Sequence, residues 1–177
     1  MNYVIDMTKG DFSDLIKGLE DYEKWIHIKI DALCKKIAER CVQQIHENFW
    51  DVKYDGVLDL SVEPAEKEAE ACYVVKAGGA TLLFVEFGAG VHYPADHPEG
   101  NGYTHGSYGK GLGNNDYWFY TGQPGTAGGE LAQDPRTGYI RMNTTITHGN
   151  PANMPVYNAM KTVGAEIESI AMEVFST

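Results

Sequence analysis

The chain has 177 residues, of which 43% are hydrophobic and 22% charged, and its formal net charge is −11. This size and composition predict one globular domain, 1–177, with its own hydrophobic core. The acidic balance argues against a general nucleic-acid binder and against binding to an anionic membrane surface, because both need Lys and Arg. No apolar run approaches the length of a membrane span and no secretory signal opens the chain, so we expect a protein kept in a cytoplasm.

A long amphipathic helix is predicted from residue 12 to residue 49. Apolar residues recur there at steps of three or four, and charged residues occupy the opposite face. Asp11, or Ser13 with Asp14, is a candidate N-cap, and Gly18 is a point where the helix could divide in two. An apolar stripe of this length has to lie on a sheet or on a neighbouring subunit.

Three short strands are predicted next, over 57–62, 71–76 and 81–87, with a hairpin or loop over 64–71 and a Gly-Gly turn over 77–80. Short consecutive strands favour an antiparallel meander. Helices packed on this small, mainly antiparallel sheet give an α+β fold.

The tract 88–149 is expected to be a long inserted loop or assembly arm. It is rich in glycine and holds the aromatic run Tyr117-Trp118-Phe119-Tyr120, and the only regular element predicted in it is a strand over 139–147. Loops of this length are uncommon in compact domains unless they are functional or ordered by a partner. A final helix is predicted to begin near Pro155, with Asn153 as its N-cap.

Possible metal ligands gather in this tract, at His92, Asp96, His97, Glu99 and His105. Their spacing matches no zinc motif, and the three cysteines, Cys34, Cys41 and Cys72, fit neither a zinc site nor a closed set of disulfides. We therefore predict no metal, no other cofactor and no catalytic residue. The alternative is a metal-dependent hydrolase that uses His92, His97 and His105 with Glu86.

Glu86 is a carboxylate at the end of an apolar run, and it has two interpretations. On the predicted strand it lies at the edge of a buried face, where it could be a general acid or base. The interpretation that we favour is structural: a carboxylate that caps loop amides or bridges subunits, since no partner acid or base stands at a recognisable spacing.

Four segments in order resemble a family of phage proteins, the neck or tail-completion proteins of long-tailed bacteriophages and related prophages. The segments are Asp55-Gly56-Val57-Leu58-Asp59-Leu60-Ser61-Val62, Cys72-Tyr73-Val74-Val75, Phe84-Val85-Glu86-Phe87-Gly88-Ala89-Gly90 and Pro151-Ala152-Asn153-Met154-Pro155-Val156-Tyr157-Asn158-Ala159. The resemblance covers residues 12–175, apart from the middle tract.

The resemblance implies a non-enzymatic virion protein that forms a ring, expected to be a hexamer, at the head–tail junction. Its partners would be copies of itself and the adjacent neck and tail-tube or tail-terminator proteins, with DNA only as passing cargo and no membrane. It would assemble in the host bacterial cytoplasm and end in the tail or neck. The candidate interface residues are Glu86, Phe87, Gly88, Tyr117, Trp118, Phe119, Tyr120, Met154 and Tyr157. A second alternative is a monomeric binding module whose aromatic run 117–120 grips a small ligand.

Overall fold

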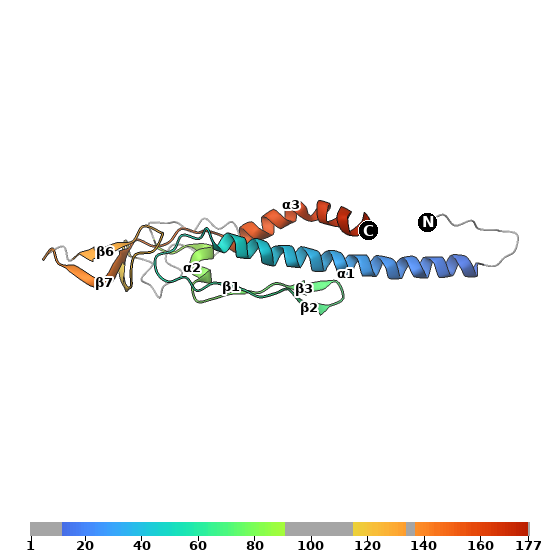
Figure 1. The fold of residues 1–177 in the computed structure, drawn as a ribbon, viewed down its shortest axis with the longest axis horizontal. Helices are drawn as coiled ribbons and strands as arrows, with labels where there is room; N and C mark the ends of the chain where they lie inside the picture. The colour runs from blue at the N-terminus through green and yellow to red at the C-terminus, as the bar shows by residue number, and fades with distance from the viewer. Residues whose placement is uncertain (1–11, 91–114, 134–136, 177) are drawn as a thin grey trace.

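The computed structural model describes residues 12–90, 115–133 and 137–176, and it is an elongated α+β protein (Figure 1). The elements are α1 (Ser13–Phe49), β1 (Ser61–Val62), β2 (Glu66–Ala69), β3 (Cys72–Val74), β4 (Ala77–Gly78), α2 (Leu82–Phe87), β5 (Trp118–Thr121), β6 (Glu130–Gln133), β7 (Ile140–Thr147) and α3 (Pro155–Ser176). The strand pairs that these elements form are antiparallel. The predicted fold class is confirmed. No helix in the described ranges has both the length and the apolar character needed to cross a bilayer.

Helix α1 is one unbroken helix of 37 residues, about 55 Å long at 1.5 Å per residue. It continues through Gly18, so the suggested break there does not occur. The predicted cap is also wrong for Ser13 and Asp14: the N-cap is Phe12, without a side-chain hydrogen bond, and Ser13 is already helical. Asp11 lies outside the described residues. Asp14 in the first turn still favours the helix, because a carboxylate there complements the helix dipole.

Helix α3 runs antiparallel along the second half of α1 (Figure 1). The pairing starts where Asn48 Nδ2 donates to the Pro155 carbonyl at 2.8 Å, and it ends where Lys29 Nζ donates to the Val174 carbonyl at 2.8 Å. Because α3 has only 22 residues, the part of α1 before Trp25 extends beyond it.

The hairpin of β2 and β3 lies along α1 on the side away from α3 (Figure 1). Asp31 of α1 fixes it: the carboxylate accepts hydrogen bonds from the Ala71 amide at 2.9 Å and the Tyr73 hydroxyl at 3.2 Å, and pairs with Lys67 Nζ at 2.7 Å. Strands β1 and β4 form a separate pair. The predicted three-stranded meander is therefore wrong, and only Ser61 and Val62 of the strand predicted over 57–62 are in a strand.

The strand predicted over 81–87 is in fact helix α2. Its first turn closes where the Val85 amide donates to the Thr81 carbonyl at 3.1 Å. A six-residue apolar run is too short for periodicity to separate strand from helix. The helical turn places Val85 and Glu86 together in the interior, where the Val85 carbonyl accepts the Asn153 amide at 2.8 Å.

The far end of the molecule is a three-stranded sheet in the order β5-β7-β6. The strand predicted over 139–147 is confirmed as β7, but β5 and β6 also form within the tract 88–149. On β7, Thr145 and Thr147 point inward and are fully buried. Their hydroxyls donate to the Gly122 carbonyl at 2.7 Å and to Asp55 Oδ2 at 2.9 Å, which satisfies their polarity inside the fold.

Candidate assembly surfaces

Glu86 caps helix α3. Its two carboxylate oxygens accept hydrogen bonds from the Val156 and Tyr157 amides, each at 2.9 Å, and the side chain is buried. These amides belong to the first turn of α3, where helical N–H groups have no partner within the helix and a negative charge is favourable. These contacts agree with the structural interpretation of Glu86, in which the carboxylate caps main-chain amides. Asn153, predicted as the N-cap of α3, instead bonds Lys53, donating to its carbonyl and accepting from its amide at 2.9 Å each.

Gly88 and Ala89 bring α2 against the segment that leads into α3. Ala89 and Asn150 exchange both main-chain hydrogen bonds at 2.9 Å. Gly88 has φ +74°, and a Cβ there would lie 2.9 Å from the Ala152 nitrogen, so glycine is required for the close approach. Phe87 beside it is half-buried.

Asp55 ties the same region to the terminal sheet. It is buried, its carboxylate accepts from the Thr147 hydroxyl and from the Ala127 amide at 3.2 Å, and its amide donates to Asn150 Oδ1 at 2.7 Å. We call the cluster of Asp55, Glu86, Ala89, Thr147 and Asn150 the junction. It joins the chain after α1, helix α2, the end of β7 and the start of α3.

Met154 and Tyr157, the other predicted interface residues near the junction, are half-buried. Met154 has φ +53°, which is uncommon for a residue other than glycine. Its carbonyl accepts the Asn158 amide at 2.9 Å. Since Tyr157 also gives its amide to Glu86, both residues help to start α3.

The aromatic run divides between two faces of β5. Trp118 and Tyr120 are half-buried and line a pocket of about 370 Å³ with Tyr54, Phe84 and Asp55. The Tyr120 hydroxyl donates to the Gln123 carbonyl at 2.9 Å. Burial raises the pKa of both phenols, Tyr54 and Tyr120, above the ordinary value, so both stay protonated at neutral pH.

Tyr117 and Phe119 point outward and are exposed. Their rings meet edge to face with centroids 5.9 Å apart, and the Arg141 guanidinium lies 5.2 Å from the Phe119 centroid. Exposed aromatic and Arg side chains are typical of the residues that contribute most to protein interfaces. The four predicted aromatic residues thus include two that shape the interior and two that can contact a partner.

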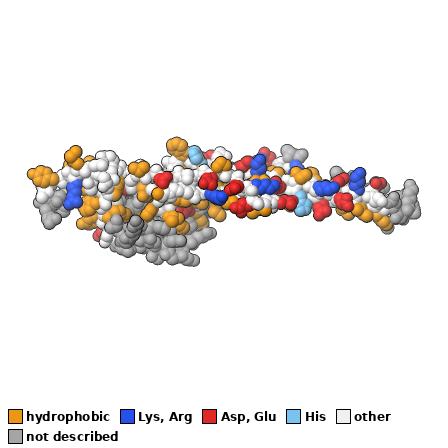
Figure 2. Space-filling model, turned by 90° about the horizontal axis from the view of Figure 1, so that it is seen from below, with side chains coloured by type: hydrophobic (Ala, Val, Ile, Leu, Met, Phe, Trp, Pro, Cys, Tyr) orange, Lys and Arg blue, Asp and Glu red, His pale blue; other side chains and the backbone are white. Residues whose placement is uncertain are grey.

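Helix α1 exposes several large apolar side chains near its start. Phe12, Ile16, Leu19 and Tyr22 lie on one side of the helix, at steps of three or four, with exposed fractions of 46%, 55%, 58% and 51%. We call these four residues the ridge. Figure 2 shows hydrophobic side chains at the surface along the helical part of the molecule and over the end formed by β5, β6 and β7.

An apolar groove lies further along α1, between that helix, β3 and α3. Its volume is about 490 Å³, and its lining carries no charged side chain. We call it the groove; among the residues that line it are Cys34, Ile37, Cys41, Cys72, Val156 and Met160. It brings together all three cysteines of the chain, which are free thiols.

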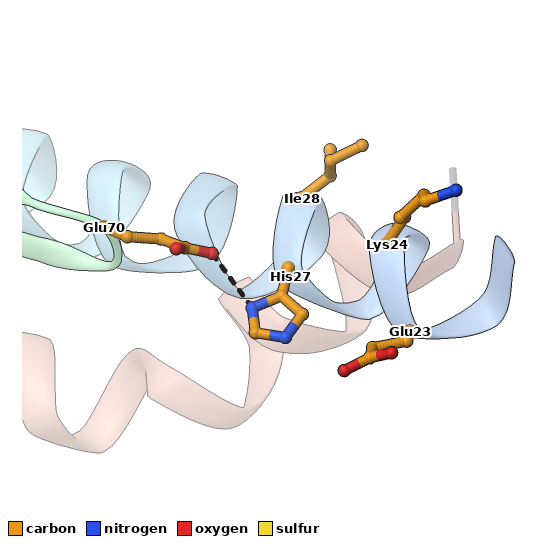
Figure 3. A pocket seen from close by; sticks show the side chains of 5 residues that line it. All are labelled: Glu23, Lys24, His27, Ile28 and Glu70. Atoms are coloured by element: carbon orange, nitrogen blue, oxygen red, sulfur yellow. Dashed lines mark hydrogen bonds and ion pairs between the residues drawn. The ribbon is translucent and has the colours of Figure 1, made fainter. Parts of the chain in front are cut away.

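A shallow pocket beside the hairpin is formed by Glu23, Lys24, His27, Ile28 and Glu70. In Figure 3 the His27 ring on α1 and the Glu70 carboxylate at the hairpin turn point toward each other, with Nδ1 and Oε1 2.9 Å apart. Ile28 points away from this pair (Figure 3). The pair fastens the hairpin turn to α1.

The hydrolase alternative depends on residues beyond the described ranges, because His92, Asp96, His97, Glu99 and His105 all lie outside them. In the part of the chain that the structure describes, no group of three or more His, Cys, Asp and Glu side chains could hold a metal ion. Glu86, the remaining member, is occupied by the amides of α3.

Comparison of the chain with models of protein families, with curated proteins and with solved structures found no match.

The sequence prediction missed Asp55 as a buried anchor, and it missed the ridge and the groove as separate surfaces. Asp55 binds groups 72 and 92 residues further along the chain, and no local pattern signals contacts at that separation. The apolar stripe of α1 was seen, but only the length of α3 reveals which half stays uncovered.

Proposed function

We propose that this chain is a structural subunit of the neck or tail of a long-tailed phage or prophage. It acts as a ring-forming tail-completion or head–tail joining protein, with six copies as the expected number. Its partners are copies of itself and the adjacent neck and tail-tube or tail-terminator proteins, with DNA passing as cargo. Its place is the virion, after assembly in the bacterial cytoplasm.

The observation that carries this proposal is the mismatch between a small core and large exposed apolar side chains. Ten apolar residues are buried in the described part of the chain and five of them are alanine, whereas Ile16, Leu19, Tyr22 and many others remain exposed. A stable domain buries its large apolar residues first, and contiguous exposed ones mark interaction sites. An elongated subunit whose core is completed by neighbours has these properties.

The junction adds support. Three of the four segments that resemble the phage family meet there, through Asp55, Glu86 with Ala89, and the chain that starts α3. The residues of the junction hold distant segments of the chain together, which is a structural role. The resemblance to the phage family includes these residues.

The second candidate is a module that binds a small ligand in the pocket beside Trp118 and Tyr120, which is the observation that favours it. Light scattering on the purified chain separates the two. The assembly proposal predicts a closed multi-copy particle, and the binding module predicts a single chain. Metal analysis of the same sample tests the hydrolase: zinc bound in a one-to-one ratio would support it.

A further inference from the structure

The ridge and the groove are parts of one continuous stripe on α1. From Phe12 the stripe continues at steps of three or four through Ile26, Ile30 and Leu33 to Ile37 and Cys41 in the groove. Burial increases along it: Leu19 is 58% exposed, Ile30 40% and Ile45 3%. This increase in burial follows the positions of α3 and the hairpin. They cover the second half of α1 on two sides, and the stripe lies between them.

Within the described part of the chain, α3 does not reach the ridge. Phe175, one residue before the end of α3, already packs edge to face on Trp25, with centroids 5.9 Å apart. The hairpin likewise reaches only to His27, through Glu70. The ridge lies up to four turns before these contacts.

The size of the ridge fits an interface. Large apolar side chains offer about 150–250 Å² each, so four of them, each about half exposed, leave on the order of 400 Å² in one patch. An interface of standard size buries about 800 Å² per partner, of which somewhat more than half is apolar. The ridge supplies most of that apolar share, and its charged flanks can supply the polar rim.

We propose that the ridge of one copy of this chain occupies the groove of another copy. The ridge is convex and apolar, the groove is concave and lined without charge, and the two lie about 30 Å apart along α1, about twenty residues at 1.5 Å each. One copy therefore presents both halves of the contact. This inference deepens the proposed function by naming its interface, and it rests on that proposal only for the number of copies.

The test compares two glutamate substitutions on α1 in the full chain. Leu19→Glu places a charge on the ridge, and Ile28→Glu is the matched control: it is 67% exposed and stands nine residues away, on the opposite side of the helix. Because burying an unpaired carboxylate costs several kcal/mol, Leu19→Glu should weaken association by at least about tenfold, and Ile28→Glu should not. Met160→Glu, which changes the groove from α3, should repeat the effect, and circular dichroism checks that each variant is folded.

The cysteines of the groove give a second readout. Burial raises the pKa of the Cys41 thiol, but Cys72 is exposed in the single chain, so its alkylation by N-ethylmaleimide reports on the groove. Cys72 should react at least about tenfold more slowly in the associated protein, and Leu19→Glu should restore the rate. If Cys72 reacts equally fast in the single and the associated chain, the inference is overturned. Protection of Cys72 in a single chain would also overturn it and would indicate a small apolar ligand in the groove instead.

The outcomes separate this inference from the proposed function. If the wild type forms a ring and Leu19→Glu does not change its mass, the inference is overturned, whereas the proposed ring is still supported. A two-copy particle that Leu19→Glu dissociates supports the inference and contradicts the ring. A wild-type chain that stays single at every concentration overturns both.

Discussion

Two buried carboxylates organise the junction, and both act on main-chain groups. Glu86 accepts two amides of α3, and Asp55 accepts the Ala127 amide together with the Thr147 hydroxyl. A buried carboxylate is stable only when hydrogen bonds replace its lost hydration. Each of these contacts joins segments more than 65 residues apart, so the two residues fix how the helical part meets the terminal sheet.

Replacing Glu86 by Gln tests its structural role. Gln has one acceptor oxygen and no charge, so one amide of α3 loses its partner and the favourable charge at the helix start disappears. We expect the free energy of unfolding to fall by about 1–3 kcal/mol, measured by urea denaturation. An unfolding curve identical to that of the wild type would remove the capping role and favour a catalytic use of the carboxylate.

Replacing Gly88 or Gly164 by Ala should change stability in opposite directions, because the two glycines have different backbone conformations and surroundings. Gly88→Ala places a Cβ 2.9 Å from the Ala152 nitrogen at φ +74°, so we expect a loss of at least about 2 kcal/mol of stability. Gly164 lies on the exposed side of α3 with no atom within 4 Å of a Cβ. Gly164→Ala should therefore stabilise by about 0.5–1 kcal/mol, through helix propensity alone. Thermal unfolding of the two variants measures both, and a tolerated Gly88→Ala would contradict the close approach.

At the scale of the elements, the long helices were predictable and the short elements were not. Sustained periodicity over 37 residues identifies α1, and the proline at position 155 marks where α3 begins. Helix α2 was mistaken for a strand because its six residues are all apolar except Glu86, and the tertiary contacts of Val85 and Glu86 decide its conformation. Strands β5 and β6 escaped prediction because each has four residues, and pairing with β7 defines them.

For the candidate site, the sequence pointed to Glu86, Gly88 and the aromatic run, and the structure places them at the junction and on β5. The structural role favoured for Glu86 fits its contacts with α3, although the strand on which it was placed is wrong. The split of the aromatic run into inward and outward pairs follows from strand alternation once β5 is known. The ridge and groove depend on where α3 and the hairpin end, and no local pattern encodes that.

The hairpin of β2 and β3 should detach from α1 in acid. Hydrogen bonds from Lys67 and then from the Ala71 amide lower the pKa of Asp31 below its ordinary value of 3.8. The folded state therefore favours the carboxylate: its contribution is complete above the ordinary pKa and is lost as the pH falls through the lowered one.

The Asp31→Asn variant isolates this effect. As the pH falls below the ordinary Asp pKa of 3.8, the wild type should lose more thermal stability than the variant, because the variant has no charge to titrate there. Other carboxylates titrate in both proteins, so the difference between the two curves is the quantity to measure. Parallel curves would show that Asp31 does not hold the hairpin.

At the scale of the whole molecule, the described chain is a rod of helices with a small sheet at one end (Figure 1). Its buried side chains include Ile45 of α1, Val85 of α2 and Val163 of α3, together with the threonines of β7. Apolar side chains are left along α1 and on the terminal sheet (Figure 2). A shape that exposes apolar surface at both ends favours association with neighbours over a solitary domain.

The measurement that tests this account most directly is the mass of the purified chain in solution, by light scattering over a wide range of concentration. We expect a multi-copy particle whose mass reaches a plateau, because a ring closes on itself and stops growing. Six copies are the expected number. A single-chain mass of 19.6 kDa at every concentration would contradict the account, since the exposed apolar surface would then have no second copy to cover it.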